Sequence, residues 1–198
     1  MLTFIVPTIN RDTLSNTISS LINQNNPNWE AIIIFDGVPA IKYNDKRIQS
    51  ISIPKCGVSN HAALVRNEGI KLVDTKWIAF VDDDDTVSNN FVDSFFEEIN
   101  INPDADCIIF RMYTRFDPDK ILPAPHHENF IKNKVGISFC IKKDLDIQFE
   151  PSITEDFFIL DKIRKLNHKM IISPYVTYFV RSQPINTKKY NRVLINYL

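Results

Sequence analysis

Residues 77–85 read WIAFVDDDD, so an unbroken apolar run leads directly into four consecutive aspartates. The apolar part is short and bounded by polar residues, which predicts a strand buried in a core. Four adjacent carboxylates repel one another, and a fold tolerates them only in water or around a cation. The stretch therefore predicts a buried strand that ends at an acidic binding edge.

The chain on both sides of this stretch alternates between strand-like and helix-like segments. Strand–helix alternation predicts an α/β fold with a mainly parallel central sheet and helices on both faces. Residues 116–132 contain three prolines and predict a long surface loop. Apolar or alternating runs predict strands over residues 4–6, 31–35, 48–53, 77–81, 106–113, 137–141, 170–172 and 176–181. Helical periodicity predicts helices over residues 14–22, 59–73 (capped by Ser59), 91–99 and 156–166.

Length and composition fit one soluble domain. The chain has 198 residues, of which 44% are hydrophobic and 24% are charged, as in ordinary globular proteins. The net charge of −1 argues against a nucleic-acid partner, and the basic run at residues 188–192 predicts only a solvated tail. No apolar stretch approaches the ~20 residues of a membrane-spanning helix, and Met1 leads straight into an apolar strand. We therefore expect a cytoplasmic protein, with peripheral membrane association left open.

Polar residues follow three of the predicted strands. Pro7 and Thr8 end the first strand, Asp36 ends the second, and the aspartates at 82–85 end the fourth. In open α/β sheets, ligands bind beyond the carboxyl ends of the strands. These residues should therefore line one crevice.

The acidic run itself predicts a cation site. Alternate residues of an extended chain project the same way, so Asp82 and Asp84 are expected to share a face, with Asp85 at the turn. Oxygen ligands without nearby His or Cys favour a hard cation, Mg²⁺ or Mn²⁺. The alternative is a solvated acidic turn that caps the following helix.

Four further residues have both a structural and a functional interpretation. Asp36 is either a turn residue or an acceptor for a base N–H. Arg66 lies in a helix and is either a surface residue or a ligand for a diphosphate. Glu155 and Asp156 open a helix, where a carboxylate answers the helix dipole or acts as a general base.

Six short segments occur in a fixed order over about the first 180 residues. They are FIVPTINR at 4–11, IIFDG at 33–37, RNEG at 66–69, IAFVDDDD at 78–85, TED at 154–156 and, more weakly, YFVR at 178–181. Each segment alone is weak, but the ordered set is specific. In order and spacing, the set resembles family 2 glycosyltransferases of the GT-A fold.

The resemblance implies a single Rossmann-like GT-A domain over residues 1–198. Residues 1–110 would form the nucleotide-sugar-binding half, residues 111–185 the acceptor-binding half, and residues 186–198 a tail. It implies a metal-dependent, inverting enzyme that moves a sugar from a UDP-sugar to a glycan or other hydroxyl acceptor.

The resemblance also implies roles for individual residues. Asp82 and Asp84 match the DxD pair, so the implied metal ligands are Asp82, Asp84 and Asp85. Asp156 would be the base that deprotonates the acceptor hydroxyl. The implied donor site comprises Pro7, Thr8, Asn10, Arg11, Asp36, Arg66, Asp82 and Asp83, with Pro7, Thr8 and Asp36 at the base and ribose and Arg66 at the diphosphate.

Two other functions remain open from the residues. A phosphatase of the haloacid dehalogenase type would use Asp82 and Asp84 before Thr86, although that family places its motif on the leading strand. A non-catalytic relative would bind the nucleotide sugar without turnover. The sequence predicts neither the sugar, the acceptor nor the oligomeric state.

Overall fold

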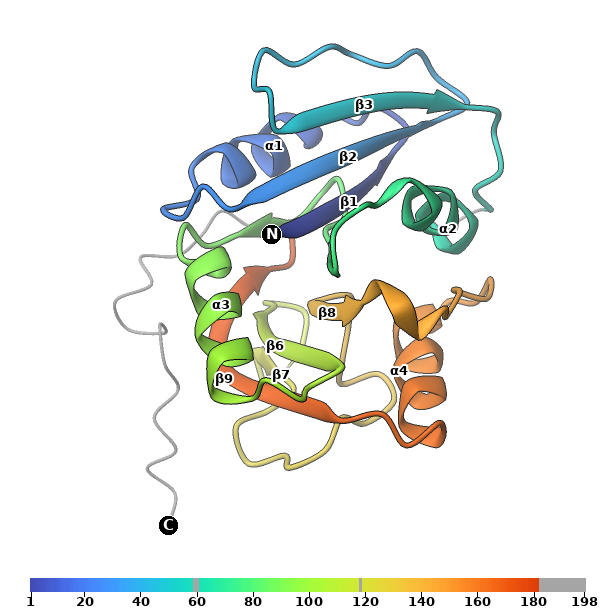
Figure 1. Ribbon diagram of the computed structural model, residues 1–198. Coiled ribbons are helices and arrows are strands. Elements are labelled where there is room, and N and C mark those ends of the chain that lie inside the picture. Colours follow the sequence, from blue (N-terminus) through green and yellow to red (C-terminus); the bar gives the residue numbers. More distant parts are fainter. Residues whose placement is uncertain (59–60, 118, 182–198) are drawn as a thin grey trace.

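The computed structural model describes residues 1–58, 61–117 and 119–181 (Figure 1). The tail at 186–198, its basic run and the Ser59 cap lie outside the described residues. The strands are β1 (Leu2–Thr8), β2 (Trp29–Asp36), β3 (Ile48–Ile53), β4 (Trp77–Phe80), β5 (Thr86–Val87), β6 (Cys107–Tyr113), β7 (Ile121–Leu122), β8 (Phe139–Lys142) and β9 (Met170–Phe179). The helices are α1 (Leu14–Ile22), α2 (Ala63–Leu72), α3 (Phe91–Ile101), α4 (Glu155–Lys165) and the short 3₁₀ helix η1 (Lys143–Leu145).

The strands form one curled sheet in the order β3-β2-β1-β4-β8-β6-β9-β5, with β7 paired to β6. Pairing is parallel from β3 to β4, and it becomes mixed beyond β4 because β8 runs antiparallel to both β4 and β6. A parallel pair needs a long crossover, usually a helix, whereas the described chain between β6 and β8 forms turns and β7. The expected α/β class is confirmed. The parallel pairing is concentrated in the first half and recurs in the second half between β6 and β9.

The two strands expected at residues 170–172 and 176–181 are one strand, β9. It contains Pro174, and its register against β6 shifts on either side of Arg111. Proline is tolerated in a sheet where the ladder is irregular, so these shifts allow the strand to continue past Pro174. Because the strand is continuous, Tyr178 near its C-terminal end lies beside the acidic turn.

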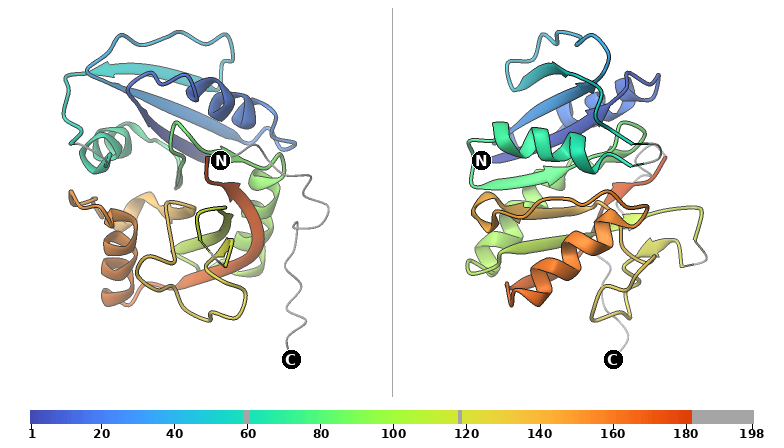
Figure 2. Two further views of the ribbon diagram at one scale, coloured as in Figure 1. Left: turned by 180° about the vertical axis from the view of Figure 1, so that it is seen from behind. Right: turned by 90° about the vertical axis from the view of Figure 1, so that its right-hand side faces the viewer.

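The helices cover both sides of the sheet, as expected. Figure 1 shows α1 and α3 on the left and α2 and α4 on the right, and the right-hand view in Figure 2 has α2 and α4 nearest the viewer. Helix α2 packs very closely on β1 at Gly69, where an added Cβ would lie 2.6 Å from the Ile5 side chain. This close approach brings the side chains of α2 over the carboxyl end of β1.

Two basic side chains form hydrogen bonds and ion pairs with the loop between β6 and β8. Arg111 is buried, and its Nη1 donates to the carbonyl oxygens of Pro123 and Ala124, the latter at 2.9 Å. Lys134 Nζ lies 2.8 Å from oxygens of both Asp117 and Asp119. The expected long loop therefore has fixed anchor points.

Among the described residues, no helix combines the length and apolar character that crossing a bilayer requires.

Candidate active site

A cavity of about 410 Å³ opens at the carboxyl ends of β1, β2 and β4. Its walls come from both halves of the chain, because the start of α4 faces the ends of these strands across it. The structure brings together every expected site residue at its lining except Asn10 and Asp85. The lining includes Pro7, Thr8, Arg11, Asp36, Arg66, Asp82, Asp83, Asp84 and Asp156.

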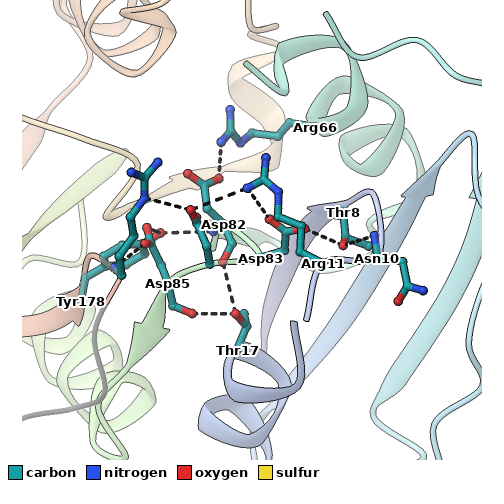
Figure 3. A network of polar contacts seen from close by, with 11 residues as sticks. Thr8, Asn10, Arg11, Thr17, Arg66, Asp82, Asp83, Asp85 and Tyr178 are labelled. Atoms are coloured by element: carbon teal, nitrogen blue, oxygen red, sulfur yellow. Dashed lines mark hydrogen bonds and ion pairs between the residues drawn. The ribbon is translucent and has the colours of Figure 1, made fainter. Parts of the chain in front are cut away.

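The acidic run divides into two groups that point in different directions. One carboxylate oxygen from each of Asp82, Asp84 and Asp85 lies within 4.8 Å of the others. Asp83 turns away and accepts hydrogen bonds from Thr8 Oγ1 at 2.6 Å and Arg11 Nη1 at 3.1 Å (Figure 3). Burial raises the pKa of Asp83, while the Thr8 hydroxyl and the Arg11 charge oppose that rise. Asp83 thus holds Thr8, at the end of β1, and Arg11 beyond it. The other three carboxylates form a cluster that suits a hard cation.

Asp85 is the most firmly held member of this acidic cluster. Its carboxylate accepts hydrogen bonds from the Tyr178 hydroxyl at 2.7 Å and the Arg181 N–H at 2.8 Å. Burial and the nearby charge of Asp82 raise the pKa of Asp85 to about 8. A bound divalent cation would offset both effects, so the all-carboxylate donor set fits such an ion.

Arg66 joins the acidic cluster to α4. Its guanidinium pairs with Asp82 on one side and Glu155 on the other, and it is almost completely buried. Burial alone would lower the pKa of Arg66, but the charges of Asp82, Asp156 and Glu155 raise it above its ordinary value. Arg66 lines the cavity, yet its strongest contacts are to protein carboxylates.

Glu155 ties α4 to α2. Its two carboxylate oxygens accept hydrogen bonds from the main-chain N–H groups of Ala62 and Ala63 at 3.2 and 3.1 Å. N–H groups at the start of a helix have no partner within the helix, and Glu155 supplies one for these two at the start of α2. Its negative charge also complements the helix dipole. The expected capping role of Glu155 therefore acts on α2 and not on its own helix.

Asp156 faces the cavity with a high proton affinity. Its Oδ1 is buried and has no hydrogen-bond partner within the described residues. Burial raises the pKa of Asp156 to about 7; Arg66 opposes this rise, while Asp82 and Glu155 add to it. A carboxylate of this kind is suited to accept a proton near neutral pH.

Asp36 lines the cavity at the end of β2, and Asn10 lies in the turn after β1. The Asp36 carboxylate accepts hydrogen bonds from Cys56 N and Gly57 N, at 2.7 and 3.1 Å. A Cβ on Gly57 would lie 2.6 Å from Asp36 Oδ2, so glycine allows this contact. Asn10 has a φ of 66°, and its N–H donates to Thr8 Oγ1 at 2.8 Å, which fixes the turn after β1. Whether these residues bind a base and ribose stays a prediction.

Several cavity and support residues were not found by sequence reasoning. Lys55 and His61 line the cavity, and Thr17 supports the acidic turn from α1. The apolar residues Leu14, Ile18, Leu21 and Ile22 predict one buried face of α1, but Ile22 is 41% exposed while Thr17 is completely buried. The signal available was the polar series at Thr17, Ser20 and Gln24, whose spacing places the three residues on the same side of α1 and its C-terminal extension.

The sequence is similar to known proteins over most of its length. The family described as Glycosyl transferase family 2 matches residues 3–164. Glycosyltransferase GlyG of Streptococcus pneumoniae serotype 4 is 24% identical over 152 residues, which cover 72% of this chain and 46% of that protein. The chain thus spans less than half the length of this curated relative.

Solved structures share the fold. S. aureus TarS in complex with UDP has a TM-score of 0.71 at 17% identity, covering 90% of this chain and 60% of that chain. Mannosyltransferase PcManGT from Pyrobaculum calidifontis, in complex with GDP-Man and Mn²⁺, has a TM-score of 0.67 at 12% identity, covering 96% and 58%.

We expect Arg66→Met to destabilise the protein strongly. The substitution keeps an apolar stem but leaves the carboxylates of Glu155 and Asp82 without the guanidinium. Removing one partner of a buried ion pair typically costs about 3–5 kcal/mol, so we expect the free energy of unfolding to fall by ~3 kcal/mol. The measurement is urea unfolding. Arg164→Met, which removes an exposed pair with Asp161 on α4, is the control and should cost less than about 1 kcal/mol. Equal losses in the two variants would contradict the structural role of Arg66.

At pH values above neutrality, we expect Asp156→Asn to raise the melting temperature of the metal-free protein. The folded-state pKa of Asp156, about 7, lies above its unfolded value, so its contribution to stability is complete below pH ~4 and is lost as pH rises through 7. Calorimetry in EDTA should show almost no difference from wild type at pH 4 and a gain of about 5 °C at pH 8.

Asp161→Asn on the same helix is the control, because the pKa of Asp161 is shifted in the opposite direction from that of Asp156. Lys165 and Arg164 lower the pKa of Asp161, although slight burial opposes them. Stability from this group is present at neutral pH and is lost as pH falls, so the variant should not gain stability at pH 8. A pH-independent difference for Asp156→Asn would show that Asp156 is not held in this state.

Proposed function

Because the chain belongs to glycosyl transferase family 2, we propose that it transfers a sugar from a nucleotide diphosphate sugar to an acceptor hydroxyl. The observation that carries this proposal is the pairing of two chemical features across one cavity. A carboxylate cluster suited to a hard cation lies on one side, and Asp156, with a pKa near neutrality, lies on the other. Donor activation and proton removal need these two features in separate places.

The donor is proposed to bind along the ends of β1, β2 and β4. Pro7, Thr8 and Asp36 would contact the base and ribose, and Asn10 and Arg11 belong to the same edge. UDP is the favoured nucleotide, which is supported by the shared fold of TarS, solved with UDP. The Arg66 guanidinium is already paired with Glu155 and Asp82. Its positive charge would offset part of the negative charge of these carboxylates and of the bound diphosphate.

The metal is proposed to be Mn²⁺ or Mg²⁺, held by Asp82, Asp84 and Asp85. Their oxygen atoms are close enough together to share one ion, and PcManGT of the same fold was solved with Mn²⁺. Such an ion stabilises the negative charge that develops on the departing diphosphate. Asp83 lies outside this ligand set and instead holds Thr8 and Arg11 in place.

Asp156 is proposed as the general base. Its Oδ1, which has no hydrogen-bond partner in the described part of the chain, would accept the proton of the acceptor hydroxyl. The hydroxyl oxygen would attack the anomeric carbon from the side opposite the diphosphate. A single displacement of this kind inverts the anomeric centre. Glu155 does not compete for this role, because its oxygens are occupied by the start of α2 and by Arg66.

The two alternative functions fare differently. A haloacid-dehalogenase-type phosphatase conflicts with the family and with the sheet, in which β4 is not the leading strand. A non-catalytic relative would bind the donor and release no sugar, so donor turnover separates it from the enzyme.

We expect UDP binding that depends on Mn²⁺. Calorimetric titration with UDP should give measurable affinity in Mn²⁺ and a large loss in EDTA, because the carboxylate cluster otherwise repels a diphosphate. Asp84→Asn removes a charged ligand and should weaken Mn²⁺-dependent binding by more than about 10-fold. Asp93→Asn, on the exposed side of α3, is the matched control and should bind as wild type does. Equal UDP affinity with and without EDTA would rule out the metal role.

We expect Asp156→Asn to lower kcat by roughly 10²–10⁴-fold, the usual contribution of a general base. Its affinity for UDP should be retained, because the amide keeps the shape of the side chain and the metal cluster is separate. The assay is release of sugar from UDP- and GDP-sugars in Mn²⁺, with UDP affinity measured alongside.

Glu155→Gln separates structure from chemistry on the same helix. It should lower the melting temperature more than it lowers kcat, because Glu155 binds the start of α2 and Arg66. Wild-type sugar release by Asp156→Asn would place the base elsewhere. Donor binding by the wild type without any release would favour the non-catalytic alternative.

A further inference from the structure

Helix α1 buries polar side chains on the side that faces the acidic turn. Thr17 is completely buried, and Ser20 and Gln24 are 8% and 7% exposed. Residues three, four and seven apart lie on one side of a helix, so Thr17 and Ser20 on α1 form a row that Gln24 continues just beyond the end of the helix. Burying polar groups is costly unless they form hydrogen bonds. Their partners therefore show what this row holds in place.

Thr17 contacts the main chain of the acidic turn directly. Its Oγ1 donates to the Asp85 carbonyl oxygen at 2.7 Å and lies 3.4 Å from the Asp82 carbonyl oxygen (Figure 3). Asp82 and Asp85 are the first and last members of the carboxylate cluster. One buried hydroxyl thus contacts the main chain at both ends of the proposed metal-binding turn.

The other members of the row hold the chain that leaves this turn. Ser20 Oγ accepts from Val87 N at 3.2 Å. Gln24 Nε2 donates to the Ser88 carbonyl oxygen at 2.6 Å, and its Oε1 accepts from Val92 N at 3.0 Å. Side chains on α1 and just beyond its end therefore bind successive main-chain groups from the acidic turn to the start of α3.

The acidic turn needs such support because its side chains repel one another. It lies between the end of β4 and the short β5, outside the regular pairing of the sheet. Asp82, Asp84 and Asp85 bring three carboxylates within 4.8 Å, and their mutual repulsion favours opening the turn. A hydrogen bond to the main chain resists this opening without occupying any carboxylate oxygen.

We infer that Thr17 is a positioning residue for the metal site, acting through the main chain of Asp82 and Asp85. This inference rests on the proposed function, because it concerns the cation proposed to bind there. The hydroxyl holds the first and last ligands at the spacing that a single cation requires. Groups that orient metal ligands typically alter metal affinity by 10–100-fold when they are removed.

The test compares Mn²⁺ affinity in the full chain across matched variants. Free Mn²⁺ is followed by electron paramagnetic resonance during titration in the presence of UDP. Thr17→Val keeps the side-chain shape and removes the hydroxyl, and it should weaken Mn²⁺ binding by about 10-fold. Thr17→Ser keeps the hydroxyl and should restore affinity close to that of the wild type. Thr17→Ala replaces Thr17→Val if the latter does not fold.

Thr75→Val is the structural control. Thr75 is also buried, and its Oγ1 donates to the Trp77 carbonyl oxygen at 3.0 Å, at the opposite end of β4. It should lower the melting temperature much as Thr17→Val does, while Mn²⁺ affinity stays at the wild-type value. This pair separates loss of a buried hydrogen bond from loss of ligand positioning.

Each outcome decides the inference. Weaker Mn²⁺ binding in Thr17→Val alone, with rescue by Thr17→Ser, supports it. Wild-type affinity in Thr17→Val, or equal weakening in Thr75→Val, overturns the positioning role while leaving the proposed metal site intact. A wild-type protein that binds no Mn²⁺ with UDP overturns the proposed metal site, and the inference with it.

Discussion

Repulsion between carboxylates is the constraint around which this site is built. Seven acidic side chains gather at one edge of the sheet, and different contacts offset their charges. The Asp36 carboxylate accepts hydrogen bonds from main-chain N–H groups. Asp83 accepts hydrogen bonds from the side chains of Thr8 and Arg11, and Asp85 accepts one from the Tyr178 hydroxyl. Asp82 and Glu155 share Arg66, Asp84 pairs with Arg181, and Asp156 keeps a high proton affinity. Asp82, Asp84 and Asp85 still bring three carboxylate oxygens within 4.8 Å of one another, and a cation fits there.

Much of the fold could be predicted because apolar runs and helical periodicity are local signals. The buried strand at 77–80 and the acidic turn after it needed only nine adjacent residues. The alternation rule also indicated that Asp82 and Asp84 project together and Asp83 does not. Resemblance of ordered segments then supplied the family, which the match over residues 3–164 confirms.

The remainder could not be predicted because it depends on partners distant in sequence. Tyr178 meets Asp85 only because β9 continues past Pro174 and pairs with the two-residue β5. Glu155 looks like a cap for its own helix, yet it binds the start of α2, which lies over 90 residues earlier. Arg66 was expected at a diphosphate, but nothing local indicates that two carboxylates flank it. The row at Thr17, Ser20 and Gln24 was visible as a pattern, although its main-chain partners were not.

The long sequence separation of these contacts has a consequence for how the chain folds. The hydrogen bonds from Tyr178 to Asp85 and from Ala62 to Glu155 each close a loop of 93 residues. Closing such loops costs conformational entropy before any contact repays it, so contacts of this kind form late. The first half of the chain can pair β1, β2 and β3 early, but the cluster around Asp85 and Arg66 waits for β9 and α4. The site is therefore completed near the end of folding, and an incompletely folded chain lacks the arrangement that would attract a cation and a diphosphate.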